Sequence, residues 1–127
     1  MAQFLIRIPA EGEMQMIPAE DAAPLSDALL CDLLHTDVTE RLRLPRKPQG
    51  FPDDTALCYL IDARGGEKAL PANFTGTCFY HTGCPIYGDL LLVKGSITDP
   101  EGAANAFTEA EAQTLCAWLR EEFGTML

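Results

Sequence analysis

The stretch Thr55–Asp62 constrains the fold most, because its apolar side chains fall on both faces of an extended strand. A strand that is apolar on both sides must be covered on both sides, so we expect it near the centre of a sheet. Residues 86–94 carry the strongest strand signal in the chain. Alternating or short apolar stretches predict further strands at residues 3–8, 14–16, 38–44, 68–70 and 75–81.

Two segments have helical periodicity. Leucines recur at three- and four-residue spacing from Leu25 to Leu34, which predicts a helix over about residues 23–35. Thr108 and Glu111 have the spacing of a capping box and predict a second helix over about residues 108–123. Because the strands are clustered rather than strictly alternating with helices, we expect an α+β fold. Its sheet would be mixed, mostly antiparallel, and packed by the two helices.

The length of 127 residues fits a single domain, residues 1–127. The N-terminal apolar stretch is interrupted by Arg7 and ended by Pro9, so it is too short for a secretory signal. The longest aliphatic run, Leu90–Val93, is far shorter than the roughly 20 residues that span a bilayer. We therefore expect a cytoplasmic protein without membrane contact. The 5 cysteines are widely spaced and indicate no disulfide framework.

The net charge is −10, from 9 basic and 19 acidic residues. Such a surface disfavours nonspecific nucleic-acid binding. The acidity either only keeps the protein soluble, which we favour, or attracts a basic protein partner. The basic residues are not spread evenly, since Arg41, Arg43, Arg46 and Lys47 form a strip without an acidic residue among them. This strip is either a solvated strand face, which we favour, or a contact for phosphate, carboxylate or a second copy of the chain.

Signatures of known catalytic sites are absent from the sequence. There is no phosphate-binding loop and no dinucleotide fingerprint, and neither Ser26 nor Ser96 lies in a nucleophile elbow. An enzyme would have to use His35 or His81 with a nearby cysteine or aspartate. We therefore favour a protein without enzymatic activity and without a cofactor.

A possible metal site lies at Cys78, His81 and Cys84, which form the pattern C-x-x-H-x-x-C. Thiolate and imidazole groups suit zinc, but the fourth ligand would have to come from Cys58 or His35 through the fold. The alternative is a hairpin with packed cysteines and a solvated His81. We favour this alternative because the paired C-x-x-C elements of structural zinc sites are missing.

Three polar positions, Asp62, Asn73 and Asp89, could converge as a binding site at one end of the sheet. The competing interpretation is structural, because Asn, Asp and Gly are the commonest turn residues and these side chains can cap backbone groups. A small-molecule or nucleotide site would combine them with Arg64 and the basic strip.

Motifs around these positions are similar to those of a known family. They are Ile61-Asp62 before a glycine turn, Leu70-Pro71-Ala72-Asn73, and Ile86-Tyr87-Gly88-Asp89 before an aliphatic run. In these motifs the segment from Thr55 to Gly95 resembles the family called domain of unknown function 3846. Many members carry Gly-Gly after the first helix, where this chain has His35-Thr36.

The resemblance implies an accessory protein of phages, plasmids and integrative elements, some of whose genes disarm host defence. Our leading hypothesis is therefore a non-enzymatic protein that contacts a basic host protein or a second copy of itself. The alternatives are a small-molecule or nucleotide-binding module and, third, a small enzyme. The candidate binding residues are Asp62, Asn73, Tyr87, Asp89, Arg41 and Arg43.

Overall fold

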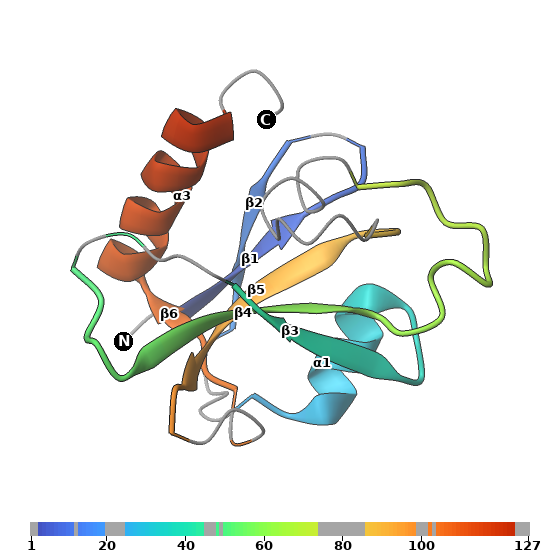
Figure 1. Ribbon diagram of the computed structural model, residues 1–127, viewed down its shortest axis with the longest axis horizontal. Coiled ribbons are helices and arrows are strands. Elements are labelled where there is room, and N and C mark those ends of the chain that lie inside the picture. Colours follow the sequence, from blue (N-terminus) through green and yellow to red (C-terminus); the bar gives the residue numbers. More distant parts are fainter. Residues whose placement is uncertain are drawn as a thin grey trace.

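The computed structural model describes residues 3–11, 13–19, 25–44, 48, 50–73, 86–98, 102 and 104–123. These residues form a six-stranded antiparallel sheet with helices packed against it (Figure 1). The α+β prediction is confirmed. Neither of the helices in this part of the chain has the length and apolar character that a membrane crossing requires.

The sheet has the order β2-β1-β5-β4-β3, and the short β6 also pairs with β1. The strands are β1 (Gln3–Ile8), β2 (Gln15–Pro18), β3 (Thr39–Arg43), β4 (Thr55–Asp62), β5 (Leu90–Ser96) and β6 (Phe107–Thr108). The expected central position of Thr55–Asp62 is confirmed, because β4 lies between β5 and β3. The hairpin expected at the N-terminus is also present, with Ile6 opposite Met16.

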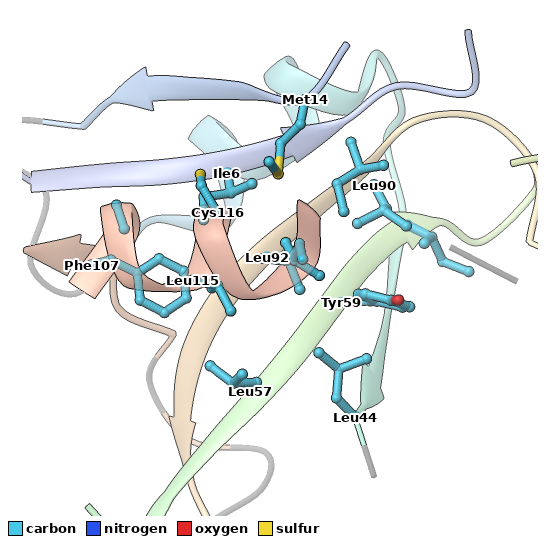
Figure 2. Packing of buried hydrophobic residues seen from close by; sticks show 14 of the residues in the cluster. Ile6, Met14, Leu44, Leu57, Tyr59, Leu90, Leu92, Phe107, Leu115 and Cys116 are labelled. Carbon is cyan, nitrogen blue, oxygen red and sulfur yellow. The ribbon is translucent and has the colours of Figure 1, made fainter. Parts of the chain in front are cut away.

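One face of the sheet packs against helix α3 (Glu109–Phe123). Ile6, Tyr59 and Leu92 come from three neighbouring strands and are fully buried with Leu115 of the helix (Figure 2). The ring of Phe107 meets that of Phe51 edge-on, with the ring centroids 6.1 Å apart. This cluster contains the side chains that point to one side along each strand, as the period of two requires.

The opposite face packs against helix α1 (Asp27–Leu34). Leu5, Leu60 and Leu91 point to this side and are buried with Leu30 and Leu34 of the helix. Because both faces are covered, β4 and β5 are apolar on both sides. The molecule therefore has three layers, with α1 and α3 on opposite sides of the sheet (Figure 1).

Helix α3 begins with the predicted capping box. The Thr108 amide donates to Glu111 Oε1 at 2.9 Å, and the Glu111 amide donates to Thr108 Oγ1 at 3.2 Å. Lys94 of β5 adds an ion pair to the same Glu111 oxygen at 2.8 Å. Two amides at the start of the helix are thereby satisfied by side chains.

Helix α1 is shorter than the sequence predicted. It begins at Asp27 rather than about residue 23, because Ser26 is extended and caps the helix by accepting from the Leu29 amide. The backbone amide of the preceding Leu25 donates to the Ala104 carbonyl, which keeps Leu25 outside the helix. At the other end, His35 takes a left-handed conformation with φ 54°. Arg7 of β1 donates to the Leu33 carbonyl in the last turn at 2.8 Å.

Two strand predictions need correction. The strand predicted for residues 86–94 begins only at Leu90, and Tyr87 makes an isolated bridge to Ala72. Residues 68–70 are not a strand but the end of a turn, in which the backbone amide of Lys68 donates to the Arg64 carbonyl. Gly65 of this turn lets the Tyr87 backbone approach closely. The strand predicted for residues 75–81 lies outside the described residues.

Candidate functional site

A cleft of about 330 Å³ opens where the end of β1 meets the end of α1. Its walls come from four separate segments: the residues after β1, the end of α1, the Leu70-Pro71 pair and the Gly88-Asp89 pair. The lining residues are Pro9, Ala10, Glu11, Leu34, His35, Leu70, Pro71, Gly88 and Asp89. The cleft therefore joins two of the motifs found in the sequence to the first strand and the first helix.

Asn73 fixes two walls of this cleft relative to one another. It is 1% exposed, and its Nδ2 donates to the carbonyl oxygens of Ile8 and Gly88, each at 3.0 Å. Its amide also donates to the Ile86 carbonyl at 2.7 Å. The sequence left a binding role and a structural role open for Asn73. In the structure the Asn73 side chain has a structural role, because its hydrogen bonds connect the backbone segments of Ile8 and Gly88 beside the cleft.

Gly88 is required by the close approach of the two motif segments. Its φ is +82°, and a Cβ atom there would lie 2.8 Å from Cδ1 of Leu70. Its amide donates to the Pro71 carbonyl at 2.7 Å. A larger residue would need both a strained backbone and a displaced Leu70.

The acidic groups of the cleft are Asp89 and Glu11. Asp89 is half-buried, and its Oδ1 accepts from the Ala10 amide at 3.0 Å, which holds the segment after β1 in place. Its Oδ2 accepts no hydrogen bond from any described residue. Glu11 is exposed. The described lining residues include neither lysine nor arginine, so the charge that they offer to a ligand is negative.

His35 brings an imidazole to the same cleft from the end of α1. Its backbone amide donates to the Asp32 carbonyl at 3.2 Å, which closes the helix in the left-handed conformation. An imidazole and carboxylates are groups that can transfer protons. The described lining contains no serine, threonine or cysteine that could act as a nucleophile beside them.

Asp62 lies at the same end of the sheet but is fully used by internal contacts. Its Oδ1 accepts from Thr36 Oγ1 and from the Arg64 amide, each at 2.9 Å, and its Oδ2 pairs with Lys68 Nζ at 2.7 Å. Burial acts to raise the pKa of this carboxyl, but the three hydrogen bonds outweigh it and hold the pKa below its ordinary range. Asp62 thus ties the end of β4 to the turn that follows.

Tyr87 lies over the Gly65-Gly66 turn. A Cβ atom at Gly65 would be 2.9 Å from the Tyr87 carbonyl oxygen, so only glycine fits there. The ring contacts Gly66 and is 36% exposed. Tyr87 does not line the cleft, although its neighbours Gly88 and Asp89 do.

The structure does not bring Arg41 and Arg43 to this cleft. They lie toward the other end of β3, where Arg43 is opposite Cys58, while Thr39 at the near end is opposite Asp62. Arg41 Nη1 donates to the Gly102 carbonyl at 2.8 Å, and Arg43 is exposed. The rest of the basic strip, residues 46 and 47, lies outside the described residues.

The zinc candidates Cys78, His81 and Cys84 also lie outside the described residues. Of the two residues considered as a fourth ligand, Cys58 is buried against α1 and His35 lies at the cleft. Burial raises the pKa of the Cys58 thiol, against the opposing charges of Arg41 and Arg43. Within the described ranges, no three His, Cys, Asp or Glu side chains are grouped as a metal site.

Sequence reasoning identified Asp89 and the motifs around it but missed the residues that complete the cleft. The segment after β1, with Pro9, Ala10 and Glu11, has the sequence pattern of an ordinary turn. Leu34 has the pattern of a core leucine. Their common location depends on the pairing of β1 with β5, which places Ile8 opposite Leu90. No local pattern in the sequence signals that pairing.

Comparison of the chain with protein families, with curated proteins and with solved structures finds no significant match.

Proposed function

We propose that this chain is a non-enzymatic binding protein whose cleft accepts a lysine or arginine side chain of a basic protein partner. The observation that carries this proposal is the composition of the cleft: Glu11 and Asp89 supply carboxylates, and no lysine or arginine is among its described lining residues. A net charge of −10 over the whole chain adds long-range attraction for such a partner.

The end of helix α1 also bears on which ligand charge the cleft favours. The cleft is lined by Leu34 and His35, where α1 ends, and the carbonyl groups at the end of a helix carry partial negative charge. The last turn of α1 contains no basic residue of its own, but the guanidinium of Arg7 donates to the Leu33 carbonyl at 2.8 Å and offsets part of that charge. The carboxylates of Glu11 and Asp89 are therefore the stronger attraction for a cation.

The resemblance to the domain of unknown function 3846 family supplies the proposed context. In that context the chain is an accessory protein of a mobile element, and its partner is a host protein with a positive, DNA-binding channel. An acidic surface can occupy such a channel by replacing the phosphate charges. The same charge repels nucleic acid, so the chain itself would not coat DNA.

A second candidate function is the binding of a small cationic molecule in the same cleft. The volume of about 330 Å³ lies at the lower end of the range for small-ligand sites. The carboxylates favour amines and guanidines over nucleotides, because phosphate groups would face Glu11 and Asp89, with no lysine or arginine among the described lining residues.

The test compares the wild type with two double variants, each of which lacks two negative charges at a different place. Glu11→Gln/Asp89→Asn removes both cleft charges and keeps an acceptor for the Ala10 amide. Asp53→Asn/Asp54→Asn removes two exposed charges before β4, at the other end of the sheet, as the matched control. Wild type and both variants are used to capture partners from a bacterial lysate, and each captured protein is then purified for titration.

We expect one stoichiometric basic protein with wild type and with the control, and at least about tenfold weaker binding to the cleft variant, which corresponds to about 1.4 kcal/mol. A partner that binds all three proteins equally contradicts the proposal. Thermal stabilisation by free arginine or a polyamine, with no protein captured, would instead support the small-molecule function.

A further inference from the structure

Three sulfur-containing side chains line a second cavity, on the opposite side of the sheet from α1. The cavity measures about 300 Å³ and lies between β2 and α3. Met14 and Met16 form one wall, and Cys116, Gln113 and Arg120 of α3 form the other. Neither the proposed function nor the cleft uses any of these residues.

The strand and the helix both direct these side chains inward. Met14 and Met16 are two residues apart on an extended segment, so they point to the same face. Met16 lies opposite Ile6, whose side chain is buried under α3. Cys116 belongs to the buried stripe of α3, and Met14 belongs to the same buried cluster (Figure 2).

We propose that Met14, Met16 and Cys116 bind a monovalent copper ion, Cu(I). Thioether and thiolate sulfurs are soft ligands, and soft ligands select Cu(I). Zinc is a poorer match, because its protein ligands are thiolate, imidazole and carboxylate, and only one of these three side chains is of that kind. Glutamate, aspartate and histidine do not line this cavity, so its described lining offers little to hard cations.

The charge balance suits a buried site. One thiolate and two neutral thioethers around a single positive ion give a neutral assembly, which costs little to hold in an apolar cavity. Burial raises the pKa of the Cys116 thiol, and the charge of Arg120 acts against that rise. Coordination of Cu(I) by Cys116 would release the thiol proton to solvent as the copper–sulfur bond forms.

An entry path is present. Met14 and Cys116 are buried, with exposed fractions of 9% and 5%, whereas Met16 is half-buried. Gln113 and Arg120 are exposed at the mouth of the cavity. An ion arriving from solvent would thus meet Met16 before the two deeper sulfurs.

The experiment must separate this site from the C-x-x-H-x-x-C segment. All proteins therefore carry Cys78→Ser, His81→Ala and Cys84→Ser in the full-length chain, and the wild type is measured beside them. Cu(I) is delivered anaerobically from a coloured chelator complex, and its transfer to the protein is followed by absorbance. X-ray absorption of the copper-loaded protein then identifies the ligand atoms.

Met14→Leu/Met16→Leu is the decisive variant, because leucine keeps the apolar volume and removes both thioethers. Cys31→Ser, which changes a half-buried cysteine on α1, is the control. Thermal unfolding without copper confirms that each variant folds.

We expect one Cu(I) per chain in the background protein, a sulfur-only ligand shell, and an unchanged affinity in Cys31→Ser. The double leucine variant should bind at least about tenfold more weakly. The proposal is overturned if the background protein takes no copper from the chelator, if nitrogen or oxygen ligands dominate, or if the leucine variant binds as tightly as its parent.

Discussion

The side-chain amide of Asn73 donates to the carbonyl oxygen of Ile8 at 3.0 Å, which ties a loop in the second half of the sequence to the last residue of the first strand. The same Nδ2 donates to Gly88, so one amide group links three segments. Asn73 therefore holds together the walls of the cleft without facing a ligand.

Replacing Asn73 by alanine should lower the free energy of unfolding by about 3 kcal/mol. Two buried carbonyl groups would lose a donor, and a small void would remain in their place. Urea unfolding followed by circular dichroism measures the effect. Asn105→Ala is the control, because the side chain of Asn105 makes no hydrogen bond to a described residue. A loss at Asn73 no larger than at Asn105 would show that the amide is dispensable.

The stability of the protein should depend on Asp62 in acid. Because the pKa of this carboxyl is lowered in the folded state below its ordinary value of 3.8, its charge stabilises the fold at neutral pH. That contribution is complete above about pH 5 and is lost as the pH falls through the folded pKa. The difference in unfolding free energy between wild type and Asp62→Asn should therefore be constant above this pH and shrink below it.

Urea titrations at a series of pH values provide the measurement. Glu111→Gln serves as a second comparison, since burial acts to raise the pKa of Glu111 while the contacts from Lys94 and Thr108 lower it overall. Each of the two substitutions should remove part of the decrease in unfolding free energy that the wild type shows in acid. A difference curve for Asp62→Asn that stays flat down to the lowest pH would exclude the proposed linkage.

Thr108→Ala should destabilise the protein by about 1 kcal/mol, because it removes the acceptor for the Glu111 amide at the start of α3. Thr114 offers a matched control in the same helix, where it is exposed and interior. Thr114→Ala should be neutral or slightly stabilising, since alanine is the better helix former. Equal losses at both positions would mean that the capping box adds nothing beyond an average threonine contact.

Ala69→Gly should stabilise the protein by about 0.5–1 kcal/mol. Ala69 is exposed with a φ of 55°, a conformation that strains any residue with a Cβ atom. The matched control is Ala63→Gly in the same turn, because Ala63 has no positive φ and should lose about 0.5–1 kcal/mol. Thermal unfolding of the two variants should shift the midpoint in opposite directions, and a lower midpoint for Ala69→Gly would contradict this reading of the turn.

The elements that the sequence predicted well are those with a strong local signal. The capping box at Thr108 and the two-sided strand at Thr55–Asp62 each carry their evidence within a few residues, and both are present. The sequence predicts too early a start for α1, because Leu25 has the spacing of a helical residue although the helix begins at Asp27. The amide of Leu25 is bonded to Ala104, a contact that no local pattern indicates.

The site was less predictable because it depends on contacts between distant segments. The sequence pointed to Asp89 and Asn73 as polar residues of two motifs, but only the structure separates their roles. Asn73 bonds to backbone carbonyls, whereas Asp89 has one oxygen directed at no described donor. No pattern in the sequence singles out Glu11, because it lines the same cleft as Asp89 only through the pairing of the first strand with β5.

That pairing also has a consequence for how the chain is made. The first strand is synthesised before its central neighbour, residues 90–96, which follows only after several seconds at ordinary translation rates. During that interval the N-terminal hairpin has no third strand, and an isolated hairpin is marginally stable at best. A nascent chain that stops before Leu90 therefore lacks the middle of its sheet. Its apolar strands stay exposed to chaperones and proteases until translation passes that point.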